Sequence, residues 1–593
     1  MKNLLALNKY FYRYKYHFFL GILFVISHNL FKVFIPEYVK DSINSVEQIL
    51  KSSEVANVGM VSENVKESIL NVLKIKGMWM LVFALTSGFF LFLTRQTIIV
   101  MSRLIENDLK NDLYAHLQEL DTAFYKANNT GDIVARLSED VGKVRMYLGP
   151  AVMYGINMLA STIATIYFMF RSNVELSIYA LLPMPILSFA IFYINARIER
   201  YSTELQENLS DLSTAAQEAF SGIRVIKSFS KEDNIQEMFT QNSLDYKQKS
   251  MKLTRIQGLF QPIMTGLVGV SIALVVYIGA KKVMNNELEV GHIAQFVLYI
   301  VNLTWPFTAI GWVTSIVQRA EVSQKRLNEI MDQKNSVQSD KNLTTALQGN
   351  IKFKDVSFTY PLTGIKALQN VSFEINSGQT LGILGSTGSG KSTIAALLTR
   401  QYDATEGAIF IDQTKIQDFA PKHIKENIGY VPQDVFLFSE TIHNNIAFGL
   451  ENASDEDVMR VAKLADVHDN IMDFPQKYET ILGERGITLS GGQKQRVSIA
   501  RALIKNPTIV LLDDCLSAVD THTENTILNN LQKELQNKTA VVISHRVSSV
   551  KFADHIIVLD KGKILEQGNH DQLLSLNGTY AQLFEKQLKS NLI

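Results

Sequence analysis

The sequence predicts a membrane protein of two parts, an α-helical membrane domain at residues 1–320 and an α/β domain at residues 351–593. Three observations support this fold class. Uncharged runs of about 20 residues are confined to the first half, which is typical of membrane spans. Strand-like and helical segments alternate in the second half, which favours a largely parallel sheet. A glycine-rich loop there joins a strand to a helix.

The composition excludes several classes of protein. A chain of 593 residues is longer than a typical domain of roughly 100–200 residues. Its 58 Lys+Arg balance 58 Asp+Glu, so the charge of the whole chain does not favour nucleic acid as a partner. A hydrophobic share of 47% excludes a disordered chain. The single cysteine, Cys515, can form neither an internal disulfide nor a cysteine-based zinc site.

Six predicted spans account for the first half, because a hydrocarbon core of about 30 Å needs about 20 apolar residues in a helix. Five of them contain long runs without Asp, Glu, Lys or Arg. The first span is weaker, because Lys32 interrupts it near one end. The spans are expected at about 17–36, 77–100, 147–170, 174–196, 256–282 and 290–318.

The segments between the spans alternate in length. The N-terminal run Lys9–Tyr16 mixes cations with aromatic rings, which favours a helix at the membrane surface and a cytoplasmic N-terminus. The segments 95–145 and 197–255 are long, charged and free of proline, with apolar residues at helical spacing. They predict cytoplasmic helical hairpins that extend roughly 40 Å beyond the bilayer.

Polar or helix-bending residues inside the spans are candidates for contacts with a bound molecule, because polar groups are costly in lipid. Arg95 could instead mark only the membrane interface, since it ends an uncharged run. The candidates are His28, Arg95, Pro183, Pro185, Gln261, Pro262, Asn302, Trp305 and Pro306.

Polarity rises after Ala320, and a linker is expected at residues 321–350. A Walker A phosphate loop then forms the most specific pattern of the chain: Gly385-Ser386-Thr387-Gly388-Ser389-Gly390-Lys391-Ser392-Thr393. It follows a strand at 381–384 and precedes a helix at 394–400. Backbone N–H groups of such a loop converge on phosphate oxygens. Lys391 is expected to reach the terminal phosphates, and the Ser392 hydroxyl to bind Mg²⁺.

A second acidic site is predicted where the apolar strand 508–512 ends. Asp513 is placed to hold the metal, directly or through water, and Asp514 to act on the attacking water. ATP and Mg²⁺ are therefore the expected cofactors.

Leu489-Ser490-Gly491-Gly492-Gln493 matches the signature motif of ATP-binding cassette (ABC) proteins and stands between the loop and the acidic site, as in that family. The whole chain resembles an exporter-type half-transporter of the bacterial multidrug and lipid A exporter kind. By this resemblance Tyr360 stacks on adenine, Gln433 contributes to the metal and catalytic site, and His545 is the switch histidine. Further similar segments are 483–486, 517–520, 130–133 with 140–141, and 222–227.

The resemblance also implies a dimer. In this family Ser490, Gly491, Gly492 and Gln493 face the phosphate loop of another subunit, so two nucleotides are held between two cassettes. The segments 130–133 and 222–227 resemble the loops that transmit cassette closure to the spans. The protein is expected in the cytoplasmic (inner) membrane, with its nucleotide-binding domain in the cytoplasm.

One departure from the family concerns Asp514, where the family usually has Glu. Its carboxylate is drawn back by ~1.5 Å, and a misplacement of about 1 Å can cost about 100-fold in rate. Slow hydrolysis is expected at this site. Exporters that resemble this chain and carry such a change are often heterodimers with one impaired and one competent site, so the resemblance implies a heterodimer with a competent partner. A working homodimer, in which a water bridges the gap, remains open.

The resemblance implies ATP-driven export of amphipathic, drug-like or lipid-like substrates by alternating access, with Lys391, Gln433, Asp514 and His545 as catalytic residues. Two alternatives are a homodimeric phospholipid or lipid A flippase, and an ATP-gated regulator without transport. The intact Lys391, Asp513, Gln433 and His545 count against a cassette that has lost hydrolysis.

Overall fold

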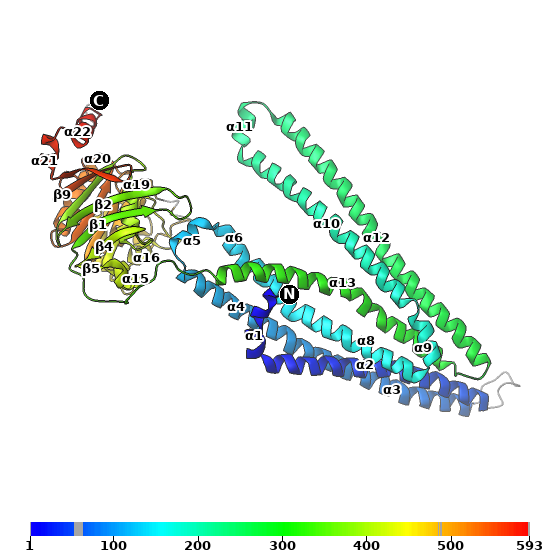
Figure 1. Cartoon of the computed structure of the whole chain (residues 1–593). Coiled ribbons are helices and arrows are strands. Elements are labelled where there is room, and N and C mark those ends of the chain that lie inside the picture. The colour runs from blue at the N-terminus through cyan, green and yellow to red at the C-terminus, as the bar shows by residue number, and fades with distance from the viewer. Residues whose placement is uncertain (1, 53–62, 484–485, 487–488, 591–593) are drawn as a thin grey trace. The chain divides into compact units, whose positions relative to one another are not determined.

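The computed structural model describes residues 2–52, 63–483, 486 and 489–590 (Figure 1). Its contacts divide the chain into two compact units. Unit 1 comprises Met1–Gln118 and Gly131–Asp332, and unit 2 comprises Glu119–Thr130 and Gln333–Ile593. The predicted fold class, a helical membrane domain followed by an α/β nucleotide-binding domain, is confirmed.

Unit 1 consists of helices. Six stretches of helix in the described chain are long and apolar enough to cross a membrane, and each overlaps one of the expected spans. These stretches are Lys15–Ser52, Glu63–Glu119, Thr130–Ser172, Val174–Ser221, Glu232–Met284 and Gly291–Met331. The main helices within them are α2 (Lys15–Ser52), α3 (Glu63–Thr94), α4 (Val100–Glu119), α6 (Thr130–Ala135), α7 (Val141–Met146), α8 (Val152–Ser172), α9 (Val174–Leu181), α10 (Met184–Ser221), α12 (Glu232–Met284) and α13 (Gly291–Met331).

Apolar side chains on the outside of these helices fit a lipid environment. On α3, Leu81, Leu85 and Phe89 recur every four residues and are 58–66% exposed. On a water-soluble protein a stripe of this kind would expose a large apolar patch to water, whereas in a membrane it contacts the apolar lipid chains. The inner faces pack tightly: a Cβ on Gly291 would lie 2.3 Å from the carbonyl oxygen of Lys40. Such close approach of backbones is typical of membrane helix packing.

The predicted helical extensions are present. Helices α10 and α12 contain 38 and 53 residues and run side by side as a long hairpin that is closed by α11 (Ile223–Ser228) (Figure 1). At 1.5 Å per residue both are far longer than a span requires. Helix α13 continues to Met331, so its last turns occupy the first part of the segment expected as a linker.

The cationic, aromatic N-terminal segment has protein contacts that the interfacial prediction did not include. It forms η1 (Asn3–Leu7) and α1 (Asn8–Arg13). The hydroxyl of Tyr10 is 2.6 Å from Asp112 of α4, and Arg13 forms a 2.9 Å ion pair with Asp108. Burial raises the pKa of Tyr10 above its usual value, and the bonded carboxylate adds to the effect. The segment is therefore attached to α4.

Unit 2 contains two sheets. The six-stranded sheet has the order β10-β9-β3-β8-β7-β6, and the pairs from β9 to β6 are parallel. The four-stranded sheet β2-β1-β4-β5 is antiparallel. The strands are β1 (Ile351–Thr359), β2 (Lys366–Ile375), β3 (Thr380–Gly385), β4 (Glu406–Ile411), β5 (Thr414–Lys415), β6 (Ile428–Val431), β7 (Ile509–Asp513), β8 (Thr539–Ser544), β9 (His555–Asp560) and β10 (Lys563–Gly568).

The parallel sheet positions the site. Strands β3, β7 and β8 are buried along their whole length, so their side chains fill the core and their carboxyl ends are the places where polar groups emerge. The helices of unit 2 are α5 (Thr122–Ala127), α14 (Lys391–Leu398), α15 (Pro421–Asn427), α16 (Ile442–Ala447), α17 (Asp455–Leu464), α18 (His468–Met472), α19 (Gly491–Leu503), α20 (Thr521–Glu534), α21 (His570–Ser575) and α22 (Thr579–Ser590).

Helix α5 belongs to unit 2 although it lies in the first third of the chain. Ala123 packs against the core of the cassette. Asp121, which caps α5, also accepts a 2.9 Å hydrogen bond from the backbone N–H of Ser336. The sequence placed this segment within a hairpin and did not predict its packing against the second unit.

Candidate functional site

The phosphate loop lies between β3 and α14. Gly388 and Gly390 have φ of +80° and +103°, a region that side chains rarely adopt. A Cβ on Gly390 would also lie 2.4 Å from the carbonyl oxygen of Ala367, so this position accepts only glycine. Helix α14 begins directly afterwards at Lys391, three residues before the helix predicted at 394. The N-terminus of α14 therefore points its free N–H groups into the loop.

Lys391 is held inside the loop. Its Nζ donates hydrogen bonds of 2.8 Å to the carbonyl oxygens of Gly385 and Ser386. Burial lowers the pKa of Lys391, while the charges of Asp514 and Asp513 raise it. Both acceptors are neutral carbonyls, so they do not neutralise the positive charge of the ammonium, which remains available to an anion that enters the loop.

Ser392 and Asp513 form a second pair. The Ser392 hydroxyl is 3.1 Å from a carboxylate oxygen of Asp513, which ends β7 and is almost fully buried. Burial raises the pKa of Asp513, and the Ser392 hydrogen bond opposes that rise. A hydroxyl and a carboxylate side by side at the foot of a phosphate loop are hard oxygen ligands, so these residues fit Mg²⁺.

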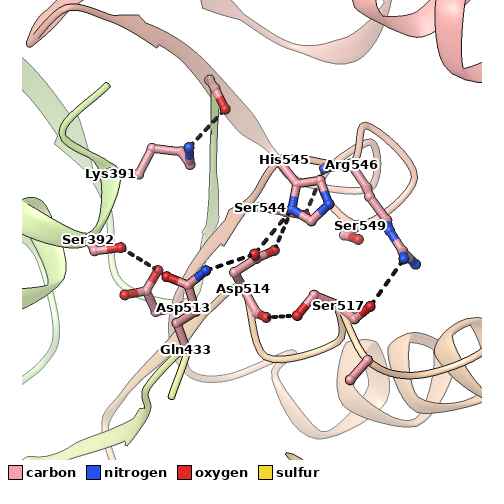
Figure 2. A network of polar contacts seen from close by, with 12 residues as sticks. Lys391, Ser392, Gln433, Asp513, Asp514, Ser517, Ser544, His545, Arg546 and Ser549 are labelled. Carbon is pink, nitrogen blue, oxygen red and sulfur yellow. Dashed lines mark hydrogen bonds and ion pairs between the residues drawn. The ribbon is translucent and has the colours of Figure 1, made fainter. Parts of the chain in front are cut away.

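Asp514, His545 and Gln433 form the third group (Figure 2). Nδ1 of His545 is 2.9 Å and 3.1 Å from the two carboxylate oxygens of Asp514. Nε2 of Gln433 is 3.5 Å from the same carboxylate. The three side chains come from the ends of β6, β7 and β8, which are neighbours in the sheet. The fold therefore brings together three residues that the sequence predicted to be catalytic and that lie far apart along the chain.

Tyr360 lies at the edge of the same unit. Its hydroxyl is 3.0 Å from the hydroxyl of Thr393, the last residue of the phosphate-loop motif. Its ring meets the ring of Tyr402 edge to face at 5.6 Å. Nζ of Lys126, from α5, is 5.6 Å from the centre of the Tyr360 ring. The sequence did not predict the contributions of Tyr402 and Lys126, since neither residue belongs to a recognisable motif.

The signature segment forms the N-terminus of α19. Ser490 caps this helix: its hydroxyl accepts from the N–H of Gln493, and the Gln493 side chain accepts from the N–H of Ser490. Ser490 and Gly491 are exposed, so the free N–H groups of a 13-residue helix are open to an anion. Gln495 of α19 binds the segment after Asp514 through the Ser517 hydroxyl and the Ala518 N–H. Residues 484 and 485 of the predicted 483–486 loop lie outside the described residues.

Comparison with known proteins identifies the family. The family described as "ABC transporter transmembrane region" matches residues 18–307, and that described as "ABC transporter" matches residues 368–517. The probable multidrug resistance ABC transporter ATP-binding/permease protein YheI of Bacillus subtilis is 38% identical over 488 residues, which are 82% of this chain and 83% of the relative. The chain belongs to the ABC transporter family.

Other ABC transporters are similar over the same length. MdlA of Escherichia coli, a multidrug resistance-like ATP-binding protein, is 36% identical over 481 residues, 81% of this chain and 82% of the relative. The ATP-dependent lipid A-core flippase of Photobacterium profundum is 32% identical over 477 residues, 80% and 82% of the two chains. The solved structure of a bacterial Atm1-family ABC exporter with ATP bound superimposes with a TM-score of 0.77 at 26% identity, covering 96% of this chain and 99% of that one.

The predicted activity and location of this ABC transporter are confirmed. It is an ATP-driven exporter, an ATPase coupled to transport across the membrane. It is a multi-pass protein of the cytoplasmic (inner) membrane with its nucleotide-binding domain in the cytoplasm. Its cassette binds ATP, and its half-transporter architecture implies a dimer.

The span residues predicted as candidates are scattered over the membrane half of this ABC transporter. Nδ1 of His28 is 2.9 Å from both the hydroxyl and the carbonyl oxygen of Ser87, so it links α2 to α3. Arg95 and Gln261 are exposed, and Pro183 precedes α10. Trp305 is the candidate that joins an aromatic cluster, defined by Tyr154, Trp305 and Trp312. The remaining candidates, Pro185, Pro262, Asn302 and Pro306, lie within α10, α12 and α13.

An ion-pair cluster in unit 1 was not predicted. Asp140 is buried and is paired with Arg326 of α13 at 2.9 Å and with the Ser323 hydroxyl at 2.8 Å. Arg326 also pairs with Asp132, within the segment that resembles the first coupling loop. The signal in the sequence was only one arginine far along the chain from two aspartates, which no spacing rule connects.

Proposed function

We propose that this ABC transporter exports amphipathic molecules with aromatic groups, and that it forms one half of a heterodimer whose Asp514 site hydrolyses ATP slowly. The observation that supports the hydrolytic part most directly is the contact of His545 with both carboxylate oxygens of Asp514. The Asp514 carboxylate is bound to His545 and must reach beyond this position to contact a water beside the terminal phosphate of ATP. The shorter aspartate side chain limits that reach.

The residues have distinct roles in this proposal. Lys391 and the N–H groups of residues 385–393 bind the phosphates, and Tyr360 stacks on the adenine ring. Ser392, Gln433 and Asp513 hold Mg²⁺, which neutralises charge on the phosphate oxygens when it is bound. Asp514 accepts the proton of the attacking water. His545 orients the Asp514 carboxylate, because its ring nitrogen is within hydrogen-bond distance of both oxygens.

The proposal of a site shared between two subunits rests on the exposed signature helix. Ser490, Gly491, Gly492 and Gln493 form the N-terminus of α19, which attracts an anion through its free N–H groups and dipole. The hydrogen bonds of Lys391, Ser392 and Asp514 described above are made with other residues. The signature residues are therefore available to the nucleotide bound by a partner cassette, and the intact motif completes that competent site.

The tip of the long hairpin supports coupling to a partner. Phe220, Val225 and Phe229 around α11 are 76%, 61% and 71% exposed, although this tip lies beyond the predicted spans. Exposed aromatic and aliphatic side chains at the end of a rigid hairpin favour docking to an apolar surface. We assign that surface to the partner cassette, so that its closure moves α10 and α12.

The substrate class follows from the aromatic cluster in the spans. The ring of Tyr154, from α8, lies 5.5 Å from Trp305 and 5.3 Å from Trp312, both from α13. The two tryptophans are 43% and 44% exposed. Aromatic faces bind apolar rings and also cations. The predicted runs 147–170 and 290–318, which contain these three residues, have no carboxylate that would require a charged substrate. The cluster therefore favours amphipathic aromatic substrates, neutral or cationic.

A transport assay tests the export proposal. Purified complex in liposomes is given ATP and a cationic aromatic dye, and dye accumulation is followed by fluorescence. We expect ATP-dependent accumulation that Trp305→Ala reduces severalfold, while Ile310→Ala, an exposed apolar residue of the same helix, leaves it nearly unchanged. Lys391→Ala should abolish it. Dye transport that survives Lys391→Ala, or that Trp305→Ala and Ile310→Ala reduce equally, would contradict the proposal.

The same assay separates the alternatives. A flippase would move a labelled phospholipid instead of the dye, and purification of this chain alone would yield an active homodimer. An ATP-gated regulator would bind ATP and move neither compound. The aromatic cluster is the observation that favours the dye.

A further inference from the structure

The last described helix, α22, contacts the loop that carries the switch histidine. Strand β8 ends at Ser544, and His545 is the next residue. Nε2 of Gln587 donates a 2.9 Å hydrogen bond to the carbonyl oxygen of His545. Its Oε1 accepts a 2.8 Å hydrogen bond from the N–H of Val547. One side-chain amide thus holds the backbone directly after His545 at two points.

Both hydrogen bonds depend on the chemistry of an amide. The His545 carbonyl requires a donor and the Val547 N–H requires an acceptor, and glutamine supplies both from one planar group. Glutamate would place a carboxylate oxygen against the His545 carbonyl and repel it. Alanine would remove both bonds.

The loop has a second anchor in the side chain of Arg546. Arg546 pairs with the buried Glu524 at 2.7 Å and donates to the carbonyl oxygen of Ser517 at 3.2 Å. His545 is adjacent to Arg546 in the chain, and its carbonyl is bound by Gln587. Its ring lies on the Asp514 carboxylate. A loop fixed by Arg546 and Gln587 leaves the His545 ring little freedom to turn away.

Helix α22 is a firm support for Gln587. The ring of Tyr580 is fully buried, its hydroxyl is 2.7 Å from Nδ1 of His570, and its N–H is 3.0 Å from Glu566. Leu583 and Phe584 pack against the main core of unit 2. The position of Gln587 is thereby tied to the core of the cassette.

We propose that Gln587 is a positioning residue for ATP hydrolysis: by holding the backbone after His545, it keeps the histidine ring on the Asp514 carboxylate. The inference rests on the proposed role of His545. It makes α22 a part of the hydrolytic machinery that does not touch nucleotide. Loss of Gln587 should therefore slow hydrolysis and leave ATP binding almost intact, since displacements of about 1 Å are costly for chemistry but not for binding.

The experiment uses the complete transporter and radioactive 8-azido-ATP. Vanadate-dependent photolabelling of this chain, separated from its partner on a gel, reports hydrolysis at its own site. Labelling on ice without vanadate reports binding. The variants are Gln587→Ala and Gln587→Glu, with Gln582→Ala as the matched control because it removes an exposed glutamine from the same helix.

We expect Gln587→Ala to slow trapping about 5- to 20-fold with half-saturating nucleotide changed less than about twofold, and Gln582→Ala to change neither. The trapping rate of Gln587→Glu should lie between those of Gln587→Ala and Gln582→Ala, because its carboxylate still accepts from the Val547 N–H but repels the His545 carbonyl. In a His545→Ala background Gln587→Ala should add less than about twofold, since coupled residues are not additive. Hydrogen exchange at Val547 should rise in Gln587→Ala alone.

Three outcomes would overturn the inference: unchanged trapping by Gln587→Ala, a loss of nucleotide binding that accounts for the slower trapping, or an equal effect with and without His545. If His545→Ala itself leaves trapping unchanged, the proposed catalytic role of His545 fails as well. Slower trapping by His545→Ala together with unchanged trapping by Gln587→Ala removes only the role of Gln587.

Discussion

Replacing Asp514 with glutamate tests the central chemical claim about the nucleotide site. The Asp514 carboxylate is 2.9 Å and 3.1 Å from Nδ1 of His545 and 3.5 Å from Nε2 of Gln433. One more methylene moves the carboxylate forward by ~1.5 Å, beyond the place where His545 now holds it. Because a misplacement of about 1 Å can cost about 100-fold, the gain in hydrolysis should be about 10- to 100-fold. Vanadate trapping of 8-azido-ATP on this chain measures it.

The matched control is Asp514→Asn, which keeps the size of the side chain but removes the base. Trapping by this variant should fall below that of the native protein. Asp514 has φ of +47°, where glutamate is less favourable than aspartate, so thermal unfolding should show a modest loss of stability in Asp514→Glu. Trapping that stays at the native level, with binding and folding intact, would refute the argument from side-chain reach.

Three further predictions concern other groups. Asp513→Asn should abolish trapping while ATP still binds, because a neutral amide is a poor ligand for Mg²⁺. Since burial raises the pKa of Asp513, trapping by the native protein should be lost on acidification at a higher pH than if this aspartate were exposed. Arg326→Ala should destabilise unit 1 by about 2 kcal/mol in thermal unfolding, because the buried Asp140 loses its ion pair with Arg326 and keeps weaker partners, such as the hydrogen bond from Ser323. A melting temperature equal to the native value would contradict this. Tyr10→Phe should lower the free energy of unfolding by about 0.5 kcal/mol at neutral pH, because the Tyr10 hydroxyl lowers the pKa of Asp112. Stability from a lowered acid pKa is lost when the acid is protonated, so this difference should vanish as the pH falls below 3.8, the ordinary pKa of an aspartate.

The site residues show how far sequence reasoning extends. The phosphate loop, Asp513 and the signature segment were recognisable because each is a contiguous pattern in which neighbouring residues act together. Gln433, Asp514 and His545 are at the ends of different strands. The sequence predicted Asp514 from its place after the strand 508–512, and Gln433 and His545 only through resemblance to the ABC family. Their direct contact is a property of the parallel sheet, whose neighbouring strands end at one edge.

Other contacts had no signal in the sequence. Gln587 is one glutamine in an amphipathic helix, and its partners are backbone groups about 40 residues away. Lys126 lies over Tyr360 because α5 packs against the cassette, while its local sequence is that of an ordinary helical hairpin. Asp140 becomes a buried charge only when α13 covers it with Arg326.

The sequence by itself determined the class of this protein. Membrane spans follow from the length of uncharged runs, and the phosphate loop follows from glycines beside a lysine and a serine, because both depend on residues close together in the chain. Tertiary structure alone decided which distant groups meet: His545 on Asp514, Gln587 on the backbone after His545, and α5 on the cassette. The reason is physical, since packing in a core depends on the shape and burial of whole elements, and local patterns do not encode these.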